Sequence, residues 1–92
     1  MNIGELIVKT AGTCGGRARI AGHRLSVSHV ARAYRSGQSP EEMLAVWPSL
    51  NLAEIHAAIA YVLANPSEVD ADLAAEERAW AQAEGADSSA AA

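Results

Sequence analysis

The start of one short helix is the feature that most constrains the fold, because the sequence specifies it in three ways. Ser39 is a favoured N-cap residue, Pro40 occupies the first helical position, and Glu42 stands where a capping box requires an acid. Pro48 disfavours helical geometry at the residue before it, so this helix ends there after about two turns. The sequence therefore places a short helix between a cap and a proline.

A longer helix follows after a very short connection. Asn51 and Glu54 form a second capping pair, and apolar residues then recur at helical spacing as far as Ala64. The buried stripe of this helix is expected to contain Leu52, Ile55, Ile59 and Val62. Another helical pattern covers residues 28–36 and stops at Gly37. Two helices joined by a few residues, with a third as support, are typical of a helix-turn-helix unit, which binds DNA in some proteins and protein in others.

Short extended segments precede these helices and an acidic helix follows them. Ile7 and Val8 favour a strand, and residues 17–27 predict a small β-hairpin around Ala21-Gly22. After Asn65-Pro66 we expect an alanine-rich acidic helix with Ser67 as its candidate cap. The predicted fold is mainly α: a three-helix, homeodomain-like or winged-helix-like helix-turn-helix core with an N-terminal β-hairpin and a C-terminal helix. The predicted division is 1–65 for the helix-turn-helix domain, 66–85 for the acidic helix and 86–92 for a disordered tail.

Opposite charges are separated along the chain. Residues 1–38 contain six basic residues and one acidic residue, a net charge of +5, whereas residues 39–92 contain ten acidic residues and one arginine, a net charge of -9. This separation favours two faces that serve two partners, one polyanionic and one basic. Two solvated surfaces are the alternative.

The basic half supplies the candidate DNA contacts. Ser28, Arg32 and Arg35 share one helix face because they follow one another at i, i+4 and i+7. Further arginines lie in the predicted hairpin and can contact phosphates. In the usual docking of a helix-turn-helix, the start of the helix capped by Asn51 approaches base edges in the major groove. The candidate DNA-binding residues are Arg17, Arg19, Arg24, Ser28, Arg32, Arg35, Ser49 and Asn51. Two alternatives stay open: the arginines pair with acids of the second half, and Asn51 only forms a capping box with Glu54.

The acidic helix carries a narrow apolar stripe and is otherwise too polar to be stable alone. It must therefore pack against its own three-helix unit or in the groove of a partner protein. The candidate partner-binding residues are Val69, Leu73, Glu77 and Trp80.

The sequence offers no constellation for catalysis or metal binding. Cys14, His23, His29 and His56 lack ligand spacing, and no orienting acid stands beside them. We expect no catalytic residues, no metal, no cofactor and no enzymatic activity. The single cysteine fits a reducing cytoplasm, and no segment has the character of a signal peptide or a membrane span.

Many residues between positions 13 and 63 together resemble the domain-of-unknown-function family 433. They are Cys14-Gly15-Gly16, Arg19-Ile20-Ala21-Gly22, Arg24, Gly37, Ser39-Pro40-Glu41-Glu42, Pro48, Leu50 and Ala58 through Tyr61. His23 departs from the threonine that is usual in the family. The resemblance implies a helix-turn-helix DNA-binding fold, pairing with a PIN-like ribonuclease toxin encoded nearby, and repression of the shared operon.

These observations lead to the hypothesis of a cytoplasmic, homodimeric antitoxin of a type II toxin–antitoxin system. Its N-terminal half binds operator DNA as a transcription repressor, and its C-terminal helix neutralises the ribonuclease. The alternative is a protein-interaction module, or a helix-turn-helix regulator without a toxin, that does not autoregulate an operator. The overall acidity of the chain would allow this alternative, and so would the lack of cations in the helix that follows Asn51.

Overall fold

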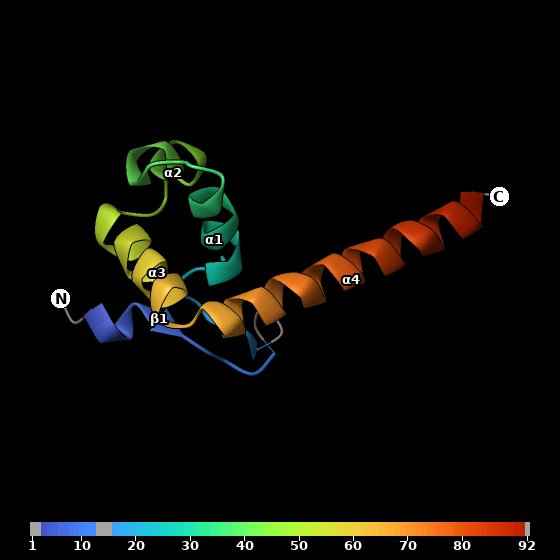
Figure 1. Ribbon diagram of the computed structural model, residues 1–92, viewed down its shortest axis with the longest axis horizontal. Coiled ribbons are helices and arrows are strands. Elements are labelled where there is room, and N and C mark those ends of the chain that lie inside the picture. The colour runs from blue at the N-terminus through green and yellow to red at the C-terminus, as the bar shows by residue number, and fades with distance from the viewer. Residues whose placement is uncertain (1–2, 13–15, 92) are drawn as a thin grey trace.

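The two capped helices and their support form the three-helix unit that the sequence predicts. The structure, a computed structural model, describes residues 3–12 and 16–91 (Figure 1). Its elements are a 3₁₀-helix at Ile3–Glu5, β1 at Ile7–Val8, β2 at Arg19–Ile20, α1 at Val27–Arg35, α2 at Pro40–Val46, α3 at Leu52–Ala64 and α4 at Pro66–Ala91. Helices α1, α2 and α3 pack against one another, and α2 is joined to α3 by residues 47–51. The predicted helix-turn-helix fold is confirmed.

Both predicted capping boxes are present and set where α2 and α3 begin. The Ser39 hydroxyl accepts from the Glu42 backbone N–H at 3.1 Å, and the Glu42 carboxylate accepts from the Ser39 N–H at 2.9 Å. Asn51 and Glu54 exchange the same pair of bonds, each at 2.9 Å. Each box satisfies two backbone donors that a helix start otherwise leaves to water.

One apolar core lies between α1, α3 and the β segment. Its largest fully buried side chains are Ile20, Val27, Val30, Met43, Ile55 and Val69. Ile20 comes from β2, Met43 from α2 and Val69 from α4, so the core draws on every part of the fold and not only on the three-helix unit. Burial of each such side chain stabilises the fold by about 1.5–3 kcal/mol.

A short N-terminal antiparallel β element is confirmed, but its paired strands are β1 and β2, and the hairpin predicted within residues 17–27 is reduced to a single bridge. β1 pairs with β2 in the register Ile7 to Ile20 and Val8 to Arg19. The chain then turns at Ala21-Gly22, where Gly22 has φ +81°, and returns so that Arg19 forms an antiparallel bridge with Ser26. A positive φ suits glycine because it has no Cβ.

Helix α4 starts immediately after α3, and its C-terminal part extends beyond the rest of the molecule (Figure 1). Pro66 is its first residue, which replaces the predicted cap at Ser67, and proline is favoured at this position because its missing N–H would have no helical partner there. Residues 86–91, which the sequence predicts as a disordered tail, continue the helix, and Ala92 lies outside the described residues. The long helix gives the molecule extents of 51 × 28 × 24 Å. Within the described part of the chain, no helix combines the length and the apolar character needed to cross a membrane.

A polar cluster fastens the first turn of α4 to the N-terminal segment and to α3. Lys9 Nζ donates to Glu68 Oε1 at 2.8 Å, and the Tyr61 hydroxyl donates to the other oxygen of Glu68. The hydrogen bond from Lys9, followed by that from Tyr61, lowers the pKa of Glu68 below its usual value of 4.5. Burial, and next the bond to Glu68, raises the pKa of Tyr61.

This cluster makes stability depend on pH in a defined direction. A carboxylate whose pKa is lowered by folding stabilises the folded state above its unfolded pKa, and that stability is lost as the pH falls through the lower folded pKa. We therefore expect Glu68→Gln to lower the free energy of unfolding by about 1 kcal/mol at pH 7, with wild type and variant converging as the pH falls below the lowered pKa of Glu68. Urea unfolding at several pH values measures this difference.

The matched control is Glu41→Gln, which removes the same charge from an exposed position of α2. Asp72, whose pKa is raised first by burial and then by Glu68, contributes in the opposite direction, and Glu68→Gln also removes the part of this shift that Glu68 causes. A difference between Glu68→Gln and wild type that stayed constant from pH 7 to pH 3 would contradict the role assigned to the cluster.

Candidate functional site

The basic face of α1 is covered by acidic residues of α4. Arg35 Nη1 lies 2.6 Å from Asp70 Oδ1, and the guanidinium of Arg32 lies 3.8 Å from both Glu76 and Glu77. Arg35, near the end of α1, meets the early residue Asp70, whereas Arg32 meets later residues of α4. The alternative in which arginines pair with acids of the second half is the one that the structure contains.

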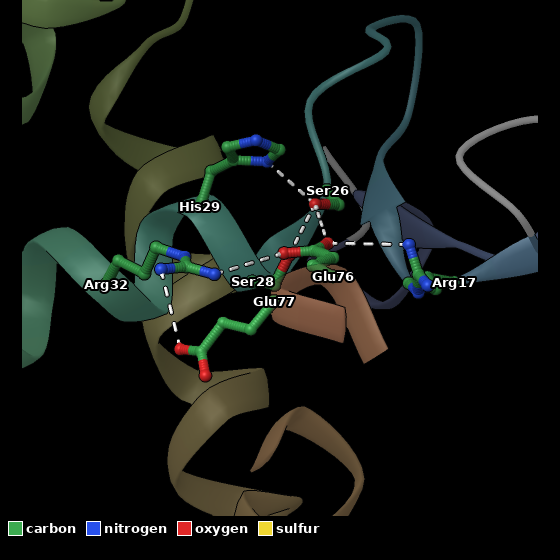
Figure 2. A network of polar contacts seen from close by, with 7 residues as sticks. All are labelled: Arg17, Ser26, Ser28, His29, Arg32, Glu76 and Glu77. Carbon is green, nitrogen blue, oxygen red and sulfur yellow. Dashed lines mark hydrogen bonds and ion pairs between the residues drawn. The ribbon is translucent and has the colours of Figure 1, made fainter. Parts of the chain in front are cut away.

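Glu76 lies at the centre of this contact (Figure 2). Its Oε1 accepts a hydrogen bond from the Ser28 hydroxyl at 2.6 Å and a longer one from the Ser26 hydroxyl at 3.5 Å. Arg17 Nη1 approaches the same oxygen at 3.7 Å, and Arg32 Nη2 approaches Oε2 at 3.8 Å. We call the four side chains of Arg17, Ser26, Ser28 and Arg32 the anion cradle.

The two serines are held in place by their neighbours. Ser26 precedes α1 without capping it through its side chain, and its hydroxyl instead lies 2.6 Å from the Ser28 hydroxyl and 2.8 Å from His29 Nδ1. A hydroxyl has only one hydrogen, so the short contacts are all satisfied when His29 donates to Ser26, Ser26 to Ser28, and Ser28 to Glu76. Both serines are buried, with exposed fractions of 2% and 3%. This chain of hydrogen bonds orients the Ser28 hydroxyl toward an anionic oxygen, whereas the hydrogen of Ser26 is directed at Ser28.

Arg19 has a different task from the one the sequence suggests. Its Nη1 donates to the His23 carbonyl and its Nη2 to the Thr10 hydroxyl, each at 3.0 Å. Its guanidinium thus joins the hairpin turn to the chain that follows β1. We leave Arg19 out of the set of phosphate ligands for this reason.

The predicted DNA contacts before α3 lie away from the cradle. The start of α3, with Ser49 and Asn51 before it, is beside α2 at the end of the three-helix unit far from α4 (Figure 1). Asn51 uses its side-chain oxygen as a cap, and Glu54 faces His23 Nε2 at 3.2 Å. Arg24 is exposed on the hairpin turn. The structure therefore brings together Arg17, Ser28 and Arg32, with Arg35 one turn further along α1.

The predicted partner-binding residues divide into two groups. Val69 is 2% exposed in the core and Leu73 packs against the core, so these two serve the chain's own fold in this structure. Trp80 is 69% exposed, and together with His29, Arg32, Glu76 and Glu77 it lines an open depression of about 530 Å³. Sequence reasoning missed Glu76, although its position completes the stripe of Val69, Leu73 and Trp80. An acid in such a stripe needs a partner, and this signal could have found it.

No group of three or more His, Cys, Asp and Glu side chains that could hold a metal ion occurs among the described residues. Cys14 lies outside the described residues.

Comparison with known proteins identifies the family. The model of a family described as "protein of unknown function (DUF433)" matches residues 7–62, which is more than half of the chain. The chain belongs to this family. A crystal structure of a DUF433 member from Anabaena variabilis has a TM-score of 0.70 and 34% sequence identity, covering 76% of this chain and 69% of that one.

The chain spans only part of the length of a relative found by sequence comparison. The uncharacterized protein y4eO of Sinorhizobium fredii is 37% identical over 62 residues, which is 67% of this chain but only 28% of that protein. The match to the DUF433 model extends from β1 nearly to the end of α3. Arg17, Ser26, Ser28 and Arg32 lie inside this DUF433 region, whereas Glu76 and all of α4 lie beyond it.

The role of Arg19 in this DUF433 fold can be separated from a role in binding. Arg19→Lys keeps the charge but loses the planar fork that reaches two partners, so we expect the free energy of unfolding to fall by about 1–2 kcal/mol. Arg35→Lys is the control, because its pair with Asp70 is exposed and its change should stay below about 0.5 kcal/mol. Denaturant unfolding measures both, and equal losses would contradict the assignment.

Proposed function

We propose that this chain is a DNA-binding helix-turn-helix antitoxin that represses its own operon and neutralises a PIN-like ribonuclease. The observation that carries the DNA-binding part is the alignment of Arg17, Ser28, Arg32 and Arg35 along one side of the three-helix unit. Guanidinium groups and hydroxyls are the usual ligands of backbone phosphates. The resemblance to antitoxins supplies the biological context.

Electrostatics sets how this face would act on DNA. Phosphate contacts position a protein on the duplex, and each cation that neutralises a phosphate releases counterions. The predicted homodimer would double the number of such contacts and match a two-fold symmetric operator. Sequence readout would come from Ser49 and Asn51, which precede α3 at the other end of the unit.

The DNA-binding proposal predicts a salt-dependent affinity for the DNA upstream of the gene. Replacing both Arg32 and Arg35 with Ala should weaken binding at low salt by about tenfold or more and reduce the slope of log affinity against log salt by about 2. Fluorescence anisotropy titrations at stepped salt concentrations measure both quantities.

Arg78→Ala is the control for this experiment, because it removes a cation from an exposed position of α4 that is not among the proposed DNA contacts. An affinity of the wild-type protein that did not change with salt, or equal effects of Arg78→Ala and the double variant, would refute the basic face as the DNA-binding surface.

The exposed part of α4 supports the partner-binding half of the proposal. Beyond Leu73 the helix exposes Glu77 and Trp80, and Trp80 is the kind of large side chain that dominates binding energy when a partner buries it. The active site of a PIN-like ribonuclease uses acidic side chains to hold divalent metal ions. A helix laid over such a site would inhibit by occlusion, and Arg78 is the cation available on α4 to compete with the metal.

Trp80→Ala tests this assignment without disturbing the fold. We expect an affinity for the ribonuclease encoded beside the gene that is about tenfold lower or worse, with an unchanged melting temperature because Trp80 is 69% exposed. Growth on co-expression with the ribonuclease and calorimetric titration report neutralisation and affinity. Val46→Ala on α2, where Val46 is 56% exposed, is the matched apolar control. Equal neutralisation by all three proteins would remove Trp80 from the interface.

A second candidate function is a protein-interaction module that does not touch DNA. The exposed face of α3, the helix expected in the major groove, carries no lysine or arginine. Its exposed residues are Leu52, Ala53, His56, Ala60, Leu63 and Ala64. A surface of this composition suits contact with protein, and the salt titration above distinguishes the two functions.

A further inference from the structure

The group that occupies the anion cradle belongs to the chain itself. Two hydroxyls and two guanidiniums converge on the carboxylate of Glu76, with the closest contact of 2.6 Å from Ser28 (Figure 2). These donors come from the segment before α1 and from α1, whereas the acceptor comes from α4, which lies beyond the DUF433 region. The site and its occupant are therefore separate parts of the sequence.

The donors of the cradle suit a larger anion than a carboxylate. Arg17 and Arg32 stand 3.7 Å and 3.8 Å from Glu76, longer than the 2.6 Å and 2.8 Å of the pairs Arg35–Asp70 and Lys9–Glu68. A phosphate has more acceptor oxygens than a carboxylate and could reach both guanidiniums and the Ser28 hydroxyl together. Arg17 and Arg32 are also partly accessible, with exposed side-chain fractions of 29% and 48%, so an anion can approach them from solvent.

Glu76 is held by the part of α4 that is least firmly attached. The helix is anchored at Val69 in the core and at Glu68 by Lys9 and Tyr61. After Glu76, each residue from Glu77 to Ala83 is exposed. The ion pairs of Glu76 with Arg17 and Arg32 are long, at 3.7 Å and 3.8 Å, so a more highly charged anion could displace the carboxylate while the start of α4 stays in place.

We propose that the anion cradle is a phosphate-binding site and that Glu76 is a built-in competitor which occupies it in the absence of ligand. The identification of the phosphate as a phosphodiester of DNA rests on the proposed function, and free inorganic phosphate carries the same chemistry. Binding of either phosphate requires Glu76 to leave the cradle, so α4 lowers the affinity of the basic face. A partner that draws α4 away from α1 raises that affinity.

Removal of the competing charge tests the proposal. Glu76→Gln keeps the size of the side chain and loses its charge, whereas Glu41→Gln removes the same charge from an exposed position of α2. Two probes are titrated into both variants and wild type: inorganic phosphate, followed by NMR shifts of the Ser28 and Arg32 amides, and labelled duplex DNA from upstream of the gene, followed by anisotropy. We expect Glu76→Gln to bind both probes about three- to tenfold tighter than wild type, and Glu41→Gln to change neither by more than about twofold.

A third variant separates occupancy of the cradle from a general effect of charge. In a Ser28→Ala background, which removes the closest donor to Glu76, the gain from Glu76→Gln should fall below about twofold. Melting temperatures of all variants confirm that each is folded at the temperature of the titrations. A gain that is the same with and without Ser28 would overturn the competition.

The two probes also separate this inference from the proposed function. Tighter phosphate binding by Glu76→Gln, with no variant binding DNA, supports the phosphate site and overturns the DNA-binding function. DNA binding by wild type that is equal in Glu76→Gln and Glu41→Gln overturns the competition and leaves DNA binding in place. A protein that binds neither probe in any variant overturns both.

Discussion

The burial of Val69 is the constraint on which the arrangement of the molecule depends. Only Asn65 separates the end of α3 from the start of α4, so α4 must turn back at that corner, and Val69 then enters the core with an exposed fraction of 2%. A helix is rigid over a few turns, so fixing Val69 also fixes the direction in which Asp70 and Glu76 point. The contacts with α1 follow from this one anchor, and they would be lost together if α4 began elsewhere.

The energies of these contacts explain how α4 can be both part of the fold and removable from the basic face. The anchor at Val69 is apolar and buried, which makes it worth about 1.5–3 kcal/mol. The exposed pair of Arg35 and Asp70 contributes about 0.2–1 kcal/mol and is weakened by salt. The burial of Val69 at the start of α4 is therefore a term that salt hardly changes, whereas the contact of the helix with α1 relies on ion pairs that salt and competing anions reduce.

Capping, proline and glycine signals in the sequence predicted the helices. They could not predict the long-range contact between α4 and α1. Both capping boxes, the proline stop at Pro48 and the turn at Gly22 depend on residues a few positions apart, and each appears where the sequence places it. The separation of charge, in contrast, favoured two faces for two partners, whereas in the structure Lys9, Arg17, Arg32 and Arg35 pair with acids of α4. That outcome depends on how α4 packs against residues 35 to 59 positions earlier, which no local pattern encodes. The same limit explains why Arg19 looked like a phosphate ligand, since its partners Thr10 and His23 are fixed by the fold of the hairpin.

The basic and acidic residues of this contact lie on opposite sides of the end of the DUF433 match. The DUF433 match contains every arginine of the basic face and ends before the acids that cover it. Substitutions in α4 can therefore change how strongly the basic face is covered without altering the three-helix unit or the core that supports it. Val69 holds the start of α4 in the core, whereas Trp80 lies on the exposed part of the helix. A protein that binds α4 near Trp80 would therefore disturb the contact between the α4 acids and the basic face, and not the burial of Val69. Under the proposed function, binding of the ribonuclease and binding of DNA would then be linked, since each favours the state in which Glu76 has left α1.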